Sequence, residues 1–401
     1  MAKKAIGPVF IILLFLYFIT LVLHISAHVD VYQWDFRTHR EAGKLFASGS
    51  NPYDPDILFP KAQTRFLYTY PPVTLFFYRL FAMTDYDSAF HIFLILKCIL
   101  LIGLVYFWKK EFLKKDADPF FFLFCILAFN SAVFLDLIAG NINLVEQVFL
   151  WLAFSFYLRR RYLLFCLFVL LGASFKMTPV FFLILLLLCD DQKKYKYFLG
   201  SAGVFCAYLL VQYIIVPDFF SEFIRNALTV VSEKGVVVPA TSKLIGDVLQ
   251  SLAKISGVAV PGGIQTAVFG IVAAGAIYLT YRAYIRLDRI DRADKEMITV
   301  FLVCLLYALI HPRFKDYAYM LLIVPSYYII KHTRFTQMAP FLFILFVLSS
   351  DRLILPAASA LMAFMWKYYP LLVAWCVWGI FIYEIFALTG EAGAKPSPKR
   401  R

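Results

Sequence analysis

The sequence predicts an all-α polytopic membrane protein, built as a bundle of about twelve hydrophobic helices with two structured non-cytoplasmic loops. Apolar residues make up 62% of the 401 residues and charged residues only 16%, against roughly 45–50% and about 25% in soluble domains. Apolar runs of about twenty residues, the length that crosses a bilayer core, recur along the chain. These runs are continuous rather than alternating, which excludes a transmembrane barrel and leaves a helical bundle.

The hydrophobic helices are expected at 6–28, 87–108, 118–138, 143–160, 162–175, 178–189, 197–216, 264–284, 296–311, 318–331, 336–350 and 370–388. An even number of spans places both chain ends on the same side. The ranges 162–175 and 178–189 are short, and Pro179 stops the first of them. Two short helices that meet at a polar break commonly line a cavity, because irregular backbone at membrane depth needs protein or water around it.

The net charge of +13 indicates topology. Lys and Arg concentrate in short stretches between the helices and in the tail 395–401, which places these stretches and both termini in the cytoplasm. We therefore expect an inner-membrane protein and no nucleic-acid partner. The first apolar run is longer than a signal-peptide core and lacks a clean cleavage site, which predicts a retained span. The seven scattered cysteines form no CxxC and indicate neither zinc nor a disulfide framework.

We expect one transmembrane domain, 1–390, with outer loops at 29–88 and 217–263, and a cytoplasmic basic tail at 391–401. In the first loop, Asp35 to Ser48 is amphipathic and predicts a helix at the interface, which Gly49 ends. The second loop has another amphipathic stretch near Phe219 to Val231. Two large structured loops suggest that the protein acts at the membrane surface.

Three features of the first loop follow one another. Asp35 stands at the head of the short helix, Asn51 to Asp54 has the composition of a turn, and Tyr70-Pro71-Pro72 suits a helix entry after an extended segment. Asp35 is either the helix N-cap or a carboxylate with a functional role. Asp30 is the competing acid.

This ordered series resembles glycosyltransferase family 87. The resemblance rests on the acid at Asp35, the Gly49-to-Asp54 turn about fourteen residues later, and the Tyr-Pro-Pro motif. Further along, Gly140-Asn141-Ile142-Asn143 is similar to the family's Gly-Gln-x-Asn, with Asn141 in place of Gln. Lys176-Met177-Thr178-Pro179 is similar to its Lys-x-x-Pro, and Ser242 lies where the second loop is expected to carry a polar segment.

The late loop departs from the family pattern. Many members carry a His about five residues after the proline, where this chain has Tyr317, while His311 precedes Pro312. The resemblance extends to about residue 330, and it is the order of the motifs that carries it.

The resemblance implies a GT-C fold and an inverting hexosyltransferase. Its donor would be a polyprenyl-phosphate-linked sugar, usually mannose, and its acceptor a glycolipid or glycan hydroxyl on the non-cytoplasmic face. The acid corresponding to Asp35 is then the general base. This agrees with the chemistry, since an acceptor hydroxyl must lose its proton as it attacks the anomeric carbon.

A lipid phosphate is the leaving group, and its developing charge needs fixed cations. The candidates for the donor phosphate are Lys176, Lys243, Arg313 and Lys315. Lys176 could instead snorkel to the nearer water surface, although ionisable residues at such depth usually face an interior or a cavity. Arg313 and Lys315 could equally be surface charges paired with Asp316.

The remaining candidates have structural alternatives. Asn141 and Asn143 either bind sugar or cap a helix. Tyr53, Tyr68 and Tyr70 either stack on sugar or anchor the chain at the interface. His311 is either a ligand or a hydrogen-bonded residue at a helix end. Lys97 lies mid-helix and is expected to pair with an acid that the sequence does not identify.

We expect no metal and no cofactor, because the outer acids are scattered and local Lys and Arg can neutralise a monophosphate. A transporter or flippase of lipid-linked saccharides is the alternative function, and it predicts an inverted repeat with ionisable residues in both halves. Neither feature is evident. A nucleotide-sugar enzyme is disfavoured, since no Gly-rich phosphate loop is present.

Overall fold

The protein is described from a computed structural model over residues 2–231, 238–257, 261, 263–287, 294–332 and 360–394. Every regular element in these residues is helical and none is a strand, which confirms the predicted all-α class. Helical elements lie at each predicted range except 336–350, which falls outside the described residues. The basic tail 395–401 also falls outside them.

Helices of membrane-spanning length confirm the membrane character of the chain. Five described helices are long and apolar enough to cross a bilayer: Tyr86–Asp116, Pro119–Ala139, Lys194–Ile215, Ile264–Leu287 and Trp366–Ala387. Shorter apolar helices include Asn143–Leu158, Tyr162–Phe175 and Thr178–Leu188. The expected total of about twelve spans stays a prediction, as do the single-domain assignment and the orientation of the termini.

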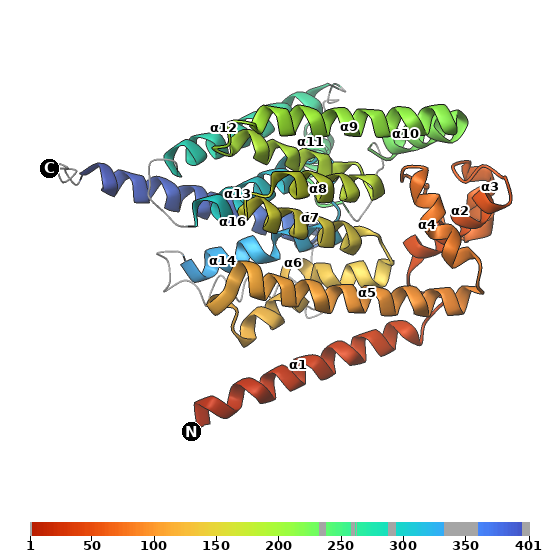
Figure 1. The fold of residues 1–401 in the computed structure, drawn as a ribbon, viewed down its shortest axis with the longest axis horizontal. Helices are drawn as coiled ribbons and strands as arrows, with labels where there is room; N and C mark the ends of the chain where they lie inside the picture. Colours follow the sequence, from red (N-terminus) through yellow and green to blue (C-terminus); the bar gives the residue numbers. More distant parts are fainter. Residues whose placement is uncertain are drawn as a thin grey trace. The chain divides into compact units, whose positions relative to one another are not determined.

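The chain divides into two compact units, residues 1–126 with 133–234, and residues 127–132 with 235–401. The first unit contains most of the expected site (Figure 1). Its helices are α1 (Ala2–Ser26), α2 (Trp34–Ala47), α3 (Pro55–Ala62), α4 (Val73–Ala82), α5 (Tyr86–Trp108), η1 (Lys109–Leu113), η2 (Lys114–Asp116), most of α6 (Pro119–Ala139), α7 (Asn143–Leu158), α8 (Tyr162–Phe175), η3 (Thr178–Leu188), α9 (Lys194–Ile215) and α10 (Pro217–Val231).

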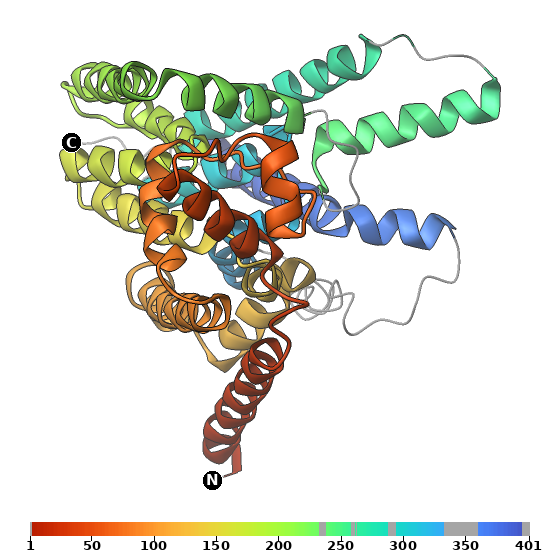
Figure 2. The same cartoon turned by 90° about the vertical axis from the view of Figure 1, so that its right-hand side faces the viewer.

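The first loop folds into three short helices that lie together (Figure 2). The expected amphipathic helix is α2, and Gly49 follows it with φ +76°, a left-handed conformation suited to glycine. Helix α3 is not anticipated by the sequence interpretation. Asp54 caps it by accepting a hydrogen bond from Asp56 N at 2.9 Å. Helix α4 begins after Pro72, as the Tyr-Pro-Pro motif predicts.

Helix α2 packs closely on α4. A Cβ built on Gly43 would lie 2.7 Å from the Tyr78 carbonyl carbon, a separation that backbone atoms cannot accommodate. Glycine at this position therefore allows the two helix backbones to come into contact, which fixes α2 against α4.

Helix α6 is interrupted, although the sequence predicted a continuous helix over 118–138. Ala128 is extended, and Phe129, Asn130 and Ser131 adopt φ values of 53°, 61° and 55°. Left-handed backbone is costly for residues other than glycine, with Asn the best tolerated. The polar pair Asn130-Ser131 marks this break inside an apolar stretch.

The predicted break between 175 and 178 is present. Helix α8 packs against α7 and ends at Phe175, Lys176 is extended with φ −153° and ψ 119°, and η3 continues as a tighter 3₁₀ helix. Lys176 therefore lies at an irregular point between two helical segments.

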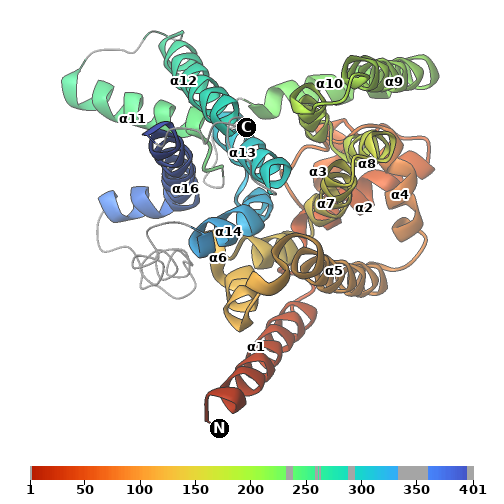
Figure 3. The same ribbon diagram turned by 60° about the vertical axis from the view of Figure 1, so that its left-hand side comes forward.

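The second unit contains the later helices of the chain, which Figure 3 labels. They are α11 (Thr241–Ser256), α12 (Ile264–Leu287), α13 (Lys295–Ile310), η4 (Asp316–Leu322), α14 (Ile323–His332) and α16 (Ala360–Ala394). Helix α13 is buried almost throughout, against α12, α14 and α16. Helix α11 lies in the second loop and is a second amphipathic helix there, beyond the predicted stretch that forms α10.

Candidate active site

Asp35 lies in the first turn of α2 with 6% of its surface exposed. It is not the helix N-cap, so this structural alternative is wrong. The N-cap is Gln33, whose backbone is left-handed and whose side chain makes no capping bond. The Gln33 N–H instead donates to the Ile138 carbonyl at 2.5 Å, which ties the start of α2 to the end of α6.

The Asp35 carboxylate is oriented by Asn141. Asn141 Nδ2 donates to Asp35 Oδ2 at 2.7 Å and also lies 2.9 Å from Tyr70 Oη. Asn141 Oδ1 accepts from Asn143 N at 3.0 Å, so the same side chain also organises the start of α7. The bond from Asn141 uses Oδ2, and the carboxylate has a second acceptor oxygen, Oδ1, to which an incoming hydroxyl can donate.

Gly140 brings the Asn141 turn against α2. It ends α6 with φ +66°, and an added Cβ would lie 2.8 Å from the Cβ atoms of both Gln33 and Phe36. A larger residue would be strained in conformation and would push the turn away from Asp35.

Lys97 pairs with Asp136, the acid that the sequence interpretation left unnamed. Lys97 Nζ lies 2.6 Å from Asp136 Oδ2, with the two side chains 1% and 0% exposed. It also donates to the backbone carbonyls of Asp136 at 2.5 Å and Asn141 at 2.9 Å. Lys97 therefore ties the middle of α5 to the turn that carries Asn141.

Lys176 forms a second pair, with Glu146 of α7. Its Nζ lies 3.0 Å from Glu146 Oε2, and the side chains are 27% and 3% exposed. Asp35 acts electrostatically on both Lys97 and Asp136, and Lys176 acts on Asp136. Three carboxylates and two lysines thus share one electrostatic neighbourhood in the first unit.

The loop tyrosines differ in how they contact this network. Tyr53 and Tyr68 are fully buried, and Tyr53 Oη donates to the Tyr70 carbonyl at 2.7 Å. Burial raises the pKa of both phenols well above the usual value, so they stay protonated. Asn226 of α10 donates to the carbonyls of Tyr53 and Tyr68. Tyr70, by contrast, reaches Asn141 directly.

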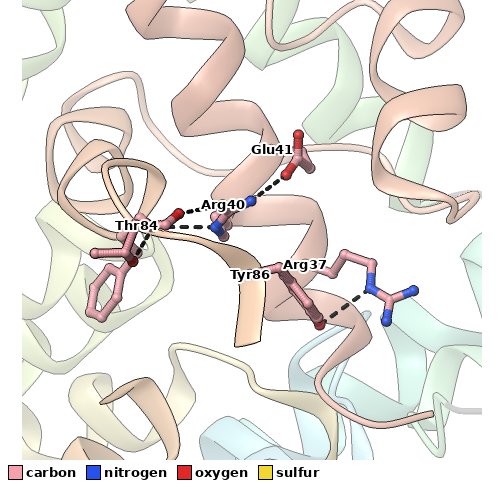
Figure 4. Close-up of polar contacts among 6 residues, drawn as sticks. Arg37, Arg40, Glu41, Thr84 and Tyr86 are labelled. Carbon is pink, nitrogen blue, oxygen red and sulfur yellow. Dashed lines mark hydrogen bonds and ion pairs between the residues drawn. The ribbon is translucent and has the colours of Figure 1, made fainter. Parts of the chain in front are cut away.

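Two arginines tie α2 to the segments around it (Figure 4). Arg40 donates to the Phe81 carbonyl at 3.2 Å and the Thr84 carbonyl at 2.5 Å, and pairs with Glu41. Arg37 donates to Tyr86 Oη at 3.2 Å and to the Asp30 carbonyl at 3.1 Å. Asp30 itself is exposed, unlike Asp35.

The other predicted residues lie in the second unit. His311 ends α13, and its Nδ1 accepts from Arg313 N at 3.1 Å. Ser242 Oγ donates to the Pro312 carbonyl at 2.5 Å, which joins the start of α11, where Lys243 lies, to the loop that carries Arg313. Lys315 lies 5.6 Å from the ring centre of Tyr317. The binding roles of Lys243, His311, Arg313 and Lys315 stay predictions.

The described residues contain no group of three His, Cys, Asp or Glu side chains placed to hold one metal ion. The proposal that the reaction needs no metal stays a prediction. Asp35 has the carboxylate needed to remove a proton from a hydroxyl. The two lysines have the positive charge needed to stabilise a departing anion.

The site has a buried carboxylate that is oriented by an amide, and two lysines that are each paired with another carboxylate. In a chain with membrane-length helices, this arrangement suits a membrane enzyme that transfers a group to a hydroxyl. The chain matches the family model of glycosyltransferase family 87 over residues 68–312, more than half its length, and it belongs to this family. The matched range contains Asn141, Glu146 and Lys176 and begins after Asp35. No curated protein and no solved structure matches the chain.

Proposed function

We propose that this glycosyltransferase moves a hexose, with mannose as the expected sugar, from a polyprenyl phosphate to a glycolipid or glycan hydroxyl. One observation carries the proposal. The Asp35 carboxylate is buried and is oriented through Oδ2 by Asn141, so that Oδ1 is available to a hydroxyl.

The proposed reaction is a single displacement. The acceptor oxygen attacks the anomeric carbon as its proton passes to Asp35. The bond from that carbon to the phosphate oxygen breaks, and the phosphate leaves with the electron pair. One displacement inverts the anomeric configuration. Asp35 then returns its proton to solvent.

Lys176 is the proposed phosphate-binding residue in the first unit. It is partly exposed, lies at the break after α8, and is paired with a carboxylate on α7. A lysine of this kind supplies the fixed positive charge that a departing phosphate needs. The sequence also singles out Lys243, Arg313 and Lys315, which lie in the second unit, as candidates for binding the donor phosphate.

An apolar groove supports a lipid-linked donor. It has a volume of about 350 Å³ and lies between α1, α5 and α6. Its lining includes Leu101, one helical turn from Lys97, and Leu137, the neighbour of Asp136. A hydrocarbon chain in this groove would approach the charged network from within the membrane.

The proposed location is the inner (plasma) membrane of the cell, with both termini cytoplasmic and Asp35 on the opposite face. The distribution of basic residues supports this orientation. The transporter alternative gains no support from the family match, since family 87 consists of glycosyltransferases.

The Asp35→Asn variant tests the proposal. We expect kcat to fall about 10²–10⁴-fold, the usual contribution of a general base, while the unfolding temperature in detergent stays near that of the wild type. Asp30→Asn is the matched control, because Asp30 is exposed and Arg37 contacts its backbone carbonyl rather than its carboxylate. A normal transfer rate in purified Asp35→Asn protein would refute the mechanism.

A further inference from the structure

Glu146 occupies an unusual place for a carboxylate beside a proposed phosphate site. It lies in the first turn of α7 with 3% of its side chain exposed, and its Oε2 is 3.0 Å from Lys176 Nζ. A negative charge is favourable near a helix N-terminus. The same two features, a helix start and a lysine, would also attract a phosphate, so Glu146 and a bound phosphate compete for the same positive charge.

The charge of the phosphate changes during the proposed reaction. The donor is a phosphodiester with one negative charge. Breaking the sugar–oxygen bond leaves a phosphomonoester, which carries about −1.5 to −2 at pH 7. A fixed carboxylate close to Lys176 therefore repels the product more strongly than the donor.

We infer that Glu146 is a specificity residue that discriminates between the singly charged donor and the doubly charged product. This inference rests on the proposed function. Glu146 keeps Lys176 in place when no phosphate is bound, yields the lysine to the donor phosphodiester, and weakens the binding of the polyprenyl phosphate that remains after transfer. The expected consequence is easier release of the spent carrier.

A purely structural ion pair would behave in the opposite way. Removing one partner of a buried pair normally destabilises its surroundings, so a structural role predicts weaker binding of every ligand at Lys176. A repulsive role predicts tighter binding, and tighter still for the more highly charged ligand. The two roles differ in sign.

The experiment compares two inhibitors with the same polyprenyl chain, polyprenyl phosphate and its methyl ester. The ester is a phosphodiester and has one charge fewer. We expect Glu146→Gln to lower the inhibition constant of polyprenyl phosphate about tenfold, equivalent to ~1.4 kcal/mol, and that of the methyl ester at most about threefold. Glu146→Asp, which keeps the charge, should retain the wild-type ratio of the two constants.

Glu111→Gln is the matched control, because Glu111 pairs with Arg159 at the other end of α7. In Glu111→Gln, the ratio of the inhibition constants of polyprenyl phosphate and its methyl ester should equal that of the wild type. An equal change for both inhibitors, no change, or weaker binding in Glu146→Gln would overturn the role of Glu146 while wild-type transfer continues. A wild-type enzyme that transfers no sugar from polyprenyl phosphate would instead refute the proposed function, and the role of Glu146 with it.

Discussion

At the scale of single residues, the site depends on how one amide orients one acid. Asn141 donates to both Asp35 and Tyr70 and accepts from Asn143. The Asn141 oxygen thus holds the start of α7 and its nitrogen holds Asp35 and Tyr70, while the sugar-binding role of Asn141 stays a prediction. The acid also depends on Gly140, whose missing Cβ allows the turn to touch α2.

Replacing Asn141 with Leu keeps the branching of the side chain but removes its three hydrogen bonds, to Asp35, to Tyr70 and from Asn143 N. We expect kcat to fall about 10–100-fold, since a buried hydrogen bond to a charged group contributes roughly 1.5–3 kcal/mol. Steady-state kinetics with a fixed donor measures this change. Asn141→Gln, which restores the family's residue at this position, should retain most activity, and an active Leu variant would show that Asp35 needs no orientation.

The order of the motifs along the sequence singled out Asp35, Asn141 and Lys176 as candidates, but the sequence could not identify the carboxylates that pair with Lys97 and Lys176. Asp136 and Glu146 are separated from Lys97 and Lys176 by 39 and 30 positions. Such pairs depend on how helices pack, which hydrophobic periodicity does not specify. The N-cap interpretation of Asp35 failed because the tertiary contact of Gln33 with Ile138 sets the helix start.

At the scale of elements, the α6–α7 turn is the central feature. Gln33 at the start of α2 and Lys97 of α5 donate hydrogen bonds to backbone carbonyls in or next to this turn. The turn also carries Asn141, whose side chain donates to Asp35. A buried ion pair contributes little net stability against an apolar pair, yet losing one partner costs about 3–5 kcal/mol. The pair therefore matters chiefly for the position of the turn.

The Lys97→Met variant should lower the free energy of unfolding by about 3–5 kcal/mol, because it leaves Asp136 buried without its partner. Lys97→Met with Asp136→Leu should recover most of that stability but not full activity, since the carbonyls of residues 136 and 141 still lack the lysine. Chemical unfolding in detergent and transfer assays measure the two effects.

The partly exposed pair of Lys367 and Asp247 provides the control for that prediction. Its side chains are 28% and 35% exposed, so Lys367→Met should cost at most about 1 kcal/mol. Equal stability of the wild type and Lys97→Met would contradict the account of the turn.

The elements were predicted unevenly. Long apolar helices and the Pro179 break follow directly from composition and proline sterics. Helices α3 and α11 were missed because short or polar helices in loops are stabilised by caps and tertiary contacts rather than by hydropathy. The break in α6 was missed because Asn130 and Ser131 are isolated within an otherwise apolar segment.

At the scale of the whole molecule, the sequence predicted the all-α class and the family correctly. Both follow from properties spread over the chain: recurring apolar segments, and motifs in a fixed order. The donor, the sugar and the acceptor are local properties of the bound substrates, and they remain proposals. The family match shows a glycosyltransferase, and the oriented Asp35 suits a base that accepts a proton from an acceptor hydroxyl. The lipid-phosphate donor belongs to the proposal.

Incubating the purified wild-type protein with a panel of polyprenyl-phosphate sugars and nucleotide sugars tests this chemistry most directly. The panel is offered with membrane glycolipids as acceptors, and the anomeric configuration of the product is determined. We expect one polyprenyl-phosphate hexose to lose its sugar, with inversion at the anomeric carbon and no transfer from nucleotide sugars. Transfer from a nucleotide sugar, or retention of configuration, would contradict the account.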